Sequence, residues 1–124
     1  MNDKLNQFAG QRYLSLETYR RNGTAVRTPV WFVEHHGELM FYTMAAAGKA
    51  KRLQRDQRVR VAPCDSRGNV KGGWVAGTAR SLEGEEAHQV HAMLNRKYGW
   101  QRRLINLLAR LRPRPRAGYA IRFT

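Results

Sequence analysis

The sequence has a single cysteine, few acidic residues and no long apolar run. Cys64 is the only cysteine among 124 residues, so the chain cannot form an internal disulfide. It lies in the apolar segment 59–64, which favours a buried structural thiol over a catalytic one. No segment reaches the roughly 18 apolar residues that a membrane-spanning helix needs, and the first residues lack the apolar stretch of a signal peptide. These absences predict a cytoplasmic protein.

The shortage of acidic residues gives the chain a strong positive charge. Nine acidic residues stand against 23 lysines and arginines, a formal net charge of +14. Glu86 is the last acidic residue, so every charge after it is basic. This balance predicts anionic partners such as phosphates, polycarboxylates or nucleic acid. Most of the basic residues are arginines, whose planar guanidinium groups favour bidentate contacts with phosphate or carboxylate.

Short apolar segments separated by turn signals predict a sheet. The expected strands cover residues 13–19, 26–35, 38–43, 58–64, 74–82 and 119–124. Asn22-Gly23 and His36-Gly37 predict hairpin turns, and Pro29 indicates an edge or a bulge in the second strand. A short helix is expected over 49–55, and helical segments are expected over 85–111 before the last strand. The pattern predicts one domain over residues 1–124, a mainly β six-stranded antiparallel barrel with flanking helices.

The segment after the third expected strand has the composition of an anion site. Small residues at 45–48 precede Lys49 and Arg52 at the start of the short helix. A helix N-terminus leaves free N–H groups and a partial positive charge, and small residues let an anion approach the backbone. Thr28 or Thr43 could add a hydroxyl group from a neighbouring strand. A solvated basic helix face would show the same pattern, so the residues alone leave both interpretations open.

Three motifs follow one another in a known order, at residues 27–31, at 41–43 and at 47–53 before the strand 58–61. Together they resemble the pyridoxamine-phosphate-oxidase-like, FMN-binding split β-barrel superfamily. Within it, the chain is most similar to the small oxidoreductases that depend on the deazaflavin coenzyme F420. The resemblance implies a homodimer with two equivalent cofactor sites at the subunit interface.

The resemblance also implies which residues hold the cofactor, either FMN or coenzyme F420. They are Arg27, Thr28, Pro29, Val30, Trp31, Tyr42, Thr43, Ala47, Gly48, Lys49 and Arg52. No catalytic side chain is implied, because such a cofactor carries the hydride while the protein binds and orients it. The expected activity is that of an oxidoreductase acting on a small organic substrate.

Two departures argue against the reaction of pyridoxamine phosphate oxidase itself. Phe32 stands where the oxidase has a basic residue at the end of the motif on the second strand. The C-terminal segment 118–124 also lacks the arginine- and histidine-containing motif with which the oxidase binds its substrate. The substrate is therefore expected to be another molecule.

Two alternatives to a flavin enzyme stay open. One is a haem- or bilin-binding member of the same superfamily, with His35 and His36 as the residues to test. The other is a basic nucleic-acid-binding barrel without catalysis. The sequence argues against nucleic acid, because the basic residues cluster at one helix start and one tail instead of interleaving with aromatic residues along a strand. No metal site is expected, since His88 and His91 have no cysteine or clear acidic ligand to accompany them.

Overall fold

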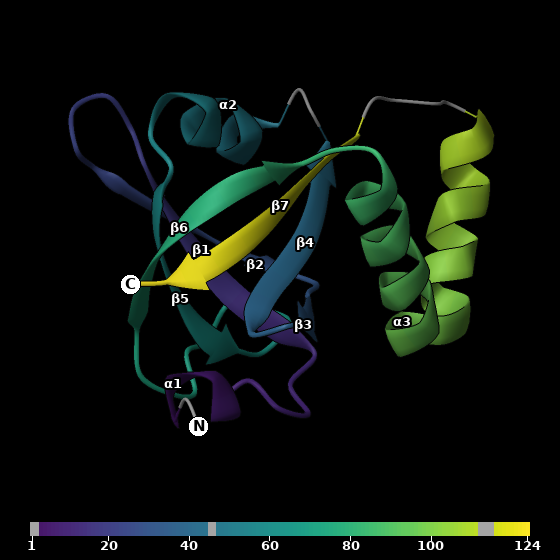
Figure 1. Ribbon diagram of the computed structural model, residues 1–124, viewed down its shortest axis with the longest axis horizontal. Helices are drawn as coiled ribbons and strands as arrows, with labels where there is room; N and C mark the ends of the chain where they lie inside the picture. Colours follow the sequence, from purple (N-terminus) through teal and green to yellow (C-terminus); the bar gives the residue numbers. More distant parts are fainter. Residues whose placement is uncertain (1–2, 45–46, 112–115) are drawn as a thin grey trace.

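The computed structural model describes residues 3–44, 47–111 and 116–124 (Figure 1). Seven strands are present in this part of the chain: β1 (Tyr13–Tyr19), β2 (Ala25–Val30), β3 (Val33–His35), β4 (Glu38–Met44), β5 (Arg58–Cys64), β6 (Val75–Leu82) and β7 (Arg116–Phe123). All neighbouring strands are antiparallel, in the order β2-β1-β5-β6-β7-β4-β3. The helices are α1 (Asp3–Asn6), α2 (Gly48–Arg55) and α3 (Glu85–Leu111).

The sheet closes on itself because its two end strands are consecutive in the sequence. Strands β2 and β3 stand at opposite ends of the strand order, yet only Trp31 and Phe32 separate them. Three peptide units span about 11 Å at most, so the ends of the sheet must curl toward each other. In Figure 1 the strands wrap around a common interior, with α2 across one end and α3 along one side. The predicted class, a mainly β antiparallel barrel with flanking helices, is confirmed.

The interior of the barrel holds the larger of two apolar clusters. It is formed by alternate residues of the strands together with the buried face of α2, including Leu14, Leu16, Phe41, Leu53, Val61 and Ile121. Ala50 and Leu53 are the buried residues of α2, and they fix which face of this helix points inward. Helix α2 therefore caps the barrel and presents its other residues toward the rim.

A second apolar cluster lies outside the barrel, between the sheet and α3. Met40, Leu82 and Ala120 from the strands pack there against Val90 and Leu94. Within α3 the backbone breaks at Gly99, whose φ of 58° lies in the left-handed region that favours glycine. In Figure 1 the second half of α3 turns back beside the first half, as expected from two helical segments in the sequence. No helix in the described part of the chain is long and apolar enough to cross a membrane.

The prediction of six strands is wrong by one, because the expected strand 26–35 is divided. The backbone N–H of Phe32 donates to the hydroxyl of Tyr98 at 3.0 Å, and its carbonyl accepts from Lys97 Nζ at 2.8 Å. Side chains of α3 thus satisfy the polar groups that a continuous strand would pair with its neighbour. The break leaves β2 as an end strand of the sheet, which agrees with the edge position expected for Pro29.

We expect Tyr98→Phe to destabilise the fold. The Tyr98 hydroxyl accepts from Phe32 N–H and donates to the carbonyl of Arg12 at 2.6 Å, so its loss leaves two backbone groups without this partner. A loss of about 1–3 kcal/mol in the free energy of unfolding is expected in urea titrations. Tyr13→Phe is the matched control, since the Tyr13 hydroxyl forms no hydrogen bond within the described residues. Equal losses in both variants would contradict the assignment.

Candidate anion-binding site beneath helix α2

The predicted anion site lies where α2 crosses the end of the barrel. Helix α2 begins at Gly48 after the N-cap residue Ala47, which forms no side-chain capping hydrogen bond. The first N–H groups of a helix have no partner within it, and they carry a partial positive charge. The structure thus places Ala47 and Gly48 at a helix start, where the backbone can meet an anion.

Two cations lie next to this helix start. Arg52 Nε donates to Thr18 Oγ1 of β1 at 2.6 Å, which fixes its guanidinium group against the barrel rim. Desolvation and the charge of Arg52 lower the pKa of the half-buried Lys49. Desolvation and the charges of Arg20 and Arg55 likewise lower the pKa of Arg52. Neither Lys49 nor Arg52 forms an ion pair with a carboxylate in the part of the chain that the structure describes.

Threonine hydroxyls from neighbouring strands complete the arrangement. Thr28 on β2 pairs with Leu16 in the ladder, so it shares the inner face of the sheet with Thr18, two residues along β1. Thr28 Oγ1 is buried, and it has no hydrogen-bond partner among the described residues. Thr43 shares the inner face of β4 with Phe41, near the point where the chain enters α2. We call Thr18, Thr28, Lys49 and Arg52 the α2 cradle.

The structure does not bring every predicted residue to the α2 cradle. Arg27 alternates to the outer face of β2, where its Nε contacts Glu17 Oε2 at 2.8 Å. Its guanidinium carbon lies 4.6 Å from the centre of the Trp74 ring. Pro29 is exposed, and Val30 is buried in the interior cluster. Within a single copy of the chain, Arg27 and Pro29 therefore face away from Thr28.

The two aromatic residues of the motifs pack against α3. The Trp31 ring stacks on the Tyr98 ring, with centres 4.6 Å apart and planes 13° from parallel. The Tyr42 hydroxyl donates to the carbonyl of Ala87, and its ring lies 5.8 Å from the His91 ring. A Cβ atom on Gly118 would come within 2.7 Å of the Tyr42 ring, so this contact needs a glycine on β7. Both rings lie on the outer side of the barrel.

Glu17, to which no motif in the sequence assigns a role, is a centre of ion pairing. It is 1% exposed and accepts hydrogen bonds from Tyr19 Oη at 2.7 Å and from Arg60 Nε and Nη2 at 2.8 and 3.0 Å. The hydrogen bonds from Arg60 lower the Glu17 pKa most, and those from Tyr19 and Arg27 lower it further. Together they outweigh desolvation, which raises this pKa, and the result is a pKa of about 2. Alternation along β1 predicts an exposed polar face there, so the sequence pattern held no signal for this buried carboxylate.

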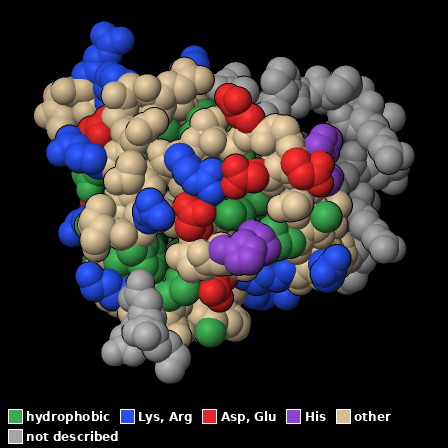
Figure 2. All heavy atoms as spheres, viewed as in Figure 1, with side chains coloured by type: hydrophobic (Ala, Val, Ile, Leu, Met, Phe, Trp, Pro, Cys, Tyr) green, Lys and Arg blue, Asp and Glu red, His purple; other side chains and the backbone are tan. Residues whose placement is uncertain are grey.

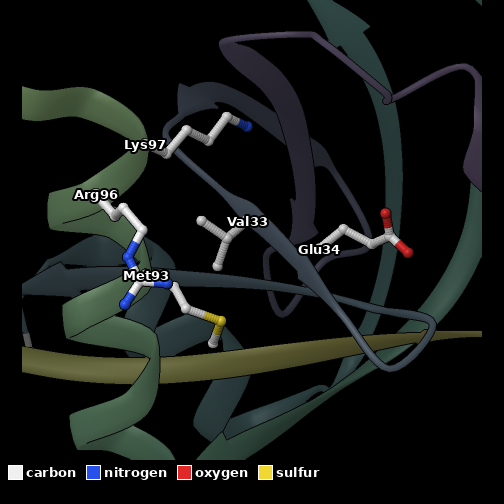
Figure 3. Close-up of a pocket in the computed structure, with 5 residues that line it drawn as sticks. All are labelled: Val33, Glu34, Met93, Arg96 and Lys97. Atoms are coloured by element: carbon white, nitrogen blue, oxygen red, sulfur yellow. The ribbon is translucent and has the colours of Figure 1, made fainter.

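A small pocket lies between β3 and α3, outside the predicted motifs. It has a volume of about 280 Å³ and is lined by Val33, Glu34, Met93, Arg96 and Lys97 (Figure 3). Burial, then the charge of Arg12, lowers the pKa of Lys97 to about 8. Lys97 Nζ lies 3.7 Å from the centre of the Phe32 ring and donates to the Phe32 carbonyl. Its ammonium group therefore helps to hold α3 against the link between β2 and β3.

Cys64 is buried, at 1% exposure, as the sequence predicts. Desolvation foremost, followed by the charge of Asp65, raises the pKa of its thiol. A thiol of this kind is a poor nucleophile near neutral pH. Among the described residues, the structure shows no cluster of histidine, cysteine and acidic side chains that could hold a metal ion.

The antiparallel barrel with flanking helices, with Lys49 and Arg52 on α2 at one end, has the architecture of a split β-barrel. The family model described as pyridoxamine 5′-phosphate oxidase matches residues 1–123, and the chain belongs to this family. No protein of curated function matches the sequence.

Solved structures share the fold at low sequence identity. The heme storage protein HutZ of Vibrio cholerae is 17% identical with a TM-score of 0.74, over 98% of this chain and 88% of that one. A conserved hypothetical protein of Mycobacterium tuberculosis is 24% identical with a TM-score of 0.71, over 98% and 79% of the two chains. An FAD-binding protein of Mesorhizobium loti is 17% identical with a TM-score of 0.62, over 98% and 85%.

We expect Glu17→Gln to lower stability in a pH-dependent way. The Glu17 pKa of about 2 lies below its ordinary value of 4.5, so ionisation stabilises the fold above about pH 4.5, and this stabilisation is lost as the pH falls toward 2. The deficit of the variant in unfolding free energy should be about 3 kcal/mol near neutral pH and should shrink toward zero near pH 2. Urea titrations across this range measure it. Glu34→Gln, at an exposed position, is the control and should show no such trend. A pH-independent deficit would contradict the role of the carboxylate.

Proposed function

We propose that the chain is a single-domain cytoplasmic oxidoreductase that holds the phosphate group of FMN or of coenzyme F420 in the α2 cradle. The observation that carries the proposal is the buried Thr28 hydroxyl without a partner, on the same sheet face as Thr18, which anchors Arg52. Burying a hydroxyl or an ammonium group without a partner costs free energy, and a phosphate would satisfy both. The family supports a flavin-type source of this phosphate, since an oxidase needs a redox cofactor and the structural relative from Mesorhizobium loti is described as FAD-binding.

Each residue of the α2 cradle has a distinct part in binding. Lys49 and Arg52 supply positive charge, and Thr18 orients the Arg52 guanidinium through its hydrogen bond. Thr28 contributes a hydroxyl donor, and the start of α2 contributes backbone N–H groups. The cofactor supplies hydride transfer when bound, while the protein binds and orients it. We therefore assign no catalytic side chain, and the substrate is proposed to be a small organic molecule.

The ring system of the cofactor needs a surface beyond the α2 cradle. Trp31 and Tyr42, which the resemblance assigns to the ring, are engaged with Tyr98 and Ala87 of α3. Arg27 lies on the outer face of β2, away from Thr28. A second copy of the chain would bring such outer surfaces next to the cradle. We therefore propose a homodimer in which each cofactor lies at the interface.

We expect FMN to bind in the micromolar range or tighter, and more tightly than riboflavin, which has the same ring but no phosphate. Lys49→Ala should remove a charge-assisted contact worth about 1.5–3 kcal/mol, which is roughly 10- to 150-fold in affinity. The same variant should leave riboflavin affinity unchanged. Quenching of flavin fluorescence measures each dissociation constant, and a parallel titration with coenzyme F420 decides between the two cofactors.

Lys51→Ala is the matched control for Lys49→Ala. It removes the same charge from an exposed position on the same helix, so it should change FMN affinity by less than about twofold. Equal losses in the two lysine variants would show attraction by the general positive charge, and the assignment of the α2 cradle would fail. The assignment would also fail if Lys49→Ala weakened the binding of riboflavin as much as the binding of FMN.

Haem is the rival cofactor, because the structural relative from Vibrio cholerae is described as a heme storage protein. The His35 and His36 rings lie 3.9 Å apart at the turn between β3 and β4, and His36 is exposed. Haem ligation by either side chain would give an intense absorbance band on addition of hemin, which His35→Ala or His36→Ala would remove. If hemin binds in this way and no flavin binds, the flavin proposal is wrong.

We expect the purified protein to be a dimer with one cofactor bound per chain. Light scattering after size-exclusion chromatography should give twice the chain mass of 14.3 kDa. Because each site is proposed to use both copies, dilution below the dimer dissociation constant should release the cofactor. A monomer that keeps full flavin affinity would contradict the interface site.

A further inference from the structure

Arg52 of the α2 cradle folds back over the first residue of its own helix. A Cβ atom placed on Gly48 would lie 2.9 Å from Arg52 Nη1, 3.7 Å from the guanidinium carbon and 3.9 Å from Nη2. Cβ atoms in proteins do not approach other heavy atoms as closely as 2.9 Å, so the guanidinium group occupies the space that a side chain at position 48 would need. Both Nη atoms therefore lie at the start of α2, where a helix has its free N–H groups.

The backbone itself does not require glycine at position 48. Gly48 is not among the residues with a positive φ, and it begins a regular helix, in which alanine is the better helix former. Glycine is therefore the less stable choice for the isolated helix at this position. What the structure gains from it is the room for the Arg52 guanidinium group.

A second contact, from β1, fixes the direction of the same guanidinium group. Arg52 Nε donates to the hydroxyl of Thr18, which is 1% exposed, so the acceptor is held rigidly by the packed barrel. This bond uses Nε and leaves the other nitrogens unused, since Nη1 and Nη2 form no hydrogen bond within the described residues. Thr18 and Gly48 together thus direct two available donor groups toward the start of α2.

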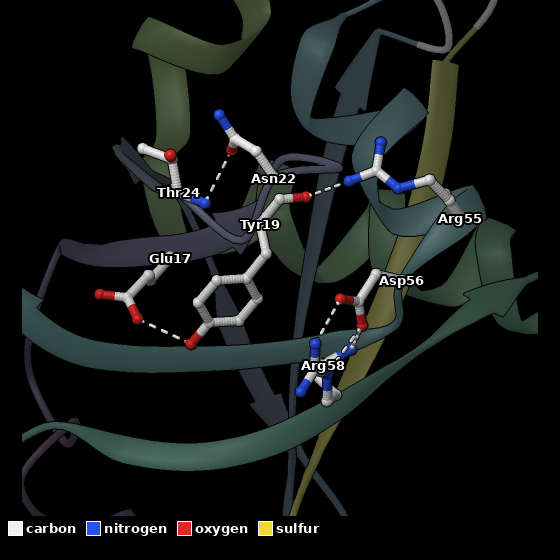
Figure 4. Close-up of polar contacts among 7 residues, drawn as sticks. All are labelled: Glu17, Tyr19, Asn22, Thr24, Arg55, Asp56 and Arg58. Atoms are coloured by element: carbon white, nitrogen blue, oxygen red, sulfur yellow. Dashed lines mark hydrogen bonds and ion pairs between the residues drawn. The ribbon is translucent and has the colours of Figure 1, made fainter.

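Arg52 needs such contacts because its charged neighbours repel it. Desolvation and the charges of Arg20 and Arg55 lower its pKa, and Lys49 is a further cation beside it. Arg55 is itself held by the carbonyl of Tyr19, to which it donates (Figure 4). In Figure 2 the Lys and Arg side chains gather along the side of the molecule that carries the β1–β2 hairpin. An unrestrained arginine among like charges would turn toward solvent, so Thr18 and the space at Gly48 keep this cation where repulsion opposes it.

We propose that Gly48 and Thr18 are positioning residues, which hold Arg52 ready for bidentate binding of one phosphate group at the start of α2. The inference rests on the proposed function in taking the bound group to be a phosphate. The two Nη donors of a planar guanidinium group match two phosphate oxygens, and the N–H groups of the helix start reach the same group. Because the guanidinium group is in place before the phosphate arrives, the loss of side-chain freedom does not oppose binding.

Gly48→Ala separates this role from a structural one. The added methyl group displaces the end of a flexible side chain at little cost to the fold, and alanine favours the helix. We therefore expect the variant to be at least as stable as the unmodified chain in urea titrations. It should nevertheless bind FMN about three- to tenfold more weakly, as flavin fluorescence quenching measures, because Arg52 is no longer in position. Riboflavin has no phosphate, so weakening of riboflavin to the same extent would refute the role.

Thr18→Val is the corresponding change on β1. It keeps the shape of the side chain and removes the hydroxyl that holds Arg52 Nε, so FMN should again bind about three- to tenfold more weakly. Thr18→Ser keeps a hydroxyl and should retain FMN affinity to within about twofold. The ratio of riboflavin to FMN affinity is the measure here, since it is insensitive to a general loss of folded protein. Equal ratios in the valine and serine variants would contradict the role of Thr18.

A double-mutant cycle shows whether both residues act through Arg52. In the Arg52→Ala background, neither Gly48→Ala nor Thr18→Val should weaken FMN further, because the side chain that they position is absent. If Gly48→Ala still weakens FMN there, the glycine serves the direct approach of the anion to the backbone, and the proposal is overturned. Arg52→Lys keeps the charge without the planar fork, so full FMN affinity in this variant would exclude bidentate binding.

Inorganic phosphate separates this inference from the proposed cofactor. A ligand that binds only the folded chain raises its resistance to urea, so phosphate should stabilise the unmodified chain more than Gly48→Ala or Thr18→Val at equal ionic strength. If phosphate does so and no flavin binds, the positioning role stands and the flavin proposal fails. If FMN affinity depends on Lys49 but not on Gly48 or Thr18, the cofactor proposal stands and the positioning role fails. If neither phosphate nor FMN distinguishes these variants from the unmodified chain, both fail.

Discussion

The link between β2 and β3 constrains the rest of the structure. Trp31 and Phe32 must join two strands that stand at opposite ends of the sheet order, and so the sheet has to curl into a barrel. Their backbone groups leave the strand ladder, and Tyr98 and Lys97 supply partners for Phe32. The Trp31 ring also stacks on Tyr98. The closure of the barrel and the docking of α3 therefore depend on the same residue, Tyr98, which contacts both residues of the link.

This closure gives the two sides of the sheet different chemistry. The inner side is apolar except near α2, where Thr18, Thr28 and Arg52 bring polar atoms to the rim. The outer side is divided between an apolar patch under α3 and a polar surface organised by Glu17. A buried carboxylate is stable there because four hydrogen bonds from three side chains compensate for its lost hydration. Basic side chains thus lie both at the rim, with Arg52, and on the outer side, with Arg27 and Arg60 around Glu17.

Local sequence signals predicted most of the sheet correctly. The boundaries of β1 and β5 agree with the predicted strands 13–19 and 58–64, and α2 begins one residue before the predicted helix. The divided strand was missed because its cause lies in Tyr98, which is 66 residues away from Phe32 in the sequence. Alternation could not reveal Glu17 as a buried charge, since both faces of β1 are covered. Such long-range partners leave no local pattern in the sequence.

Which of the predicted site residues lie together also depends on the fold, and the sequence motif alone does not reveal it. The motif at 27–31 lies on one strand, and neighbouring side chains on a strand point to opposite faces. Thr28 therefore belongs to the α2 cradle while Arg27 and Pro29 face outward, so the residues of one sequence motif do not line one pocket within one chain. Helix α2 differs, because Lys49 and Arg52 are three residues apart and can share a helix face. The fold therefore keeps the two predicted cations of α2 close together, whereas it divides the predicted residues of β2 between two faces of the sheet.

Helix α3 interrupts a hairpin. Leu82 at the end of β6 pairs with Gly118 of β7, so a tight turn would suffice to join the two strands, yet the whole of α3 lies between them. The entropic cost of such an excursion grows slowly with its length, and changes in its length need not alter the register of the sheet. Insertions and deletions within such a surface connection are tolerated better than changes within the strands. The position of α3 is nevertheless fixed at Tyr98. Its hydroxyl group bonds to the backbone of Phe32 and Arg12 and so holds the link between β2 and β3 in place.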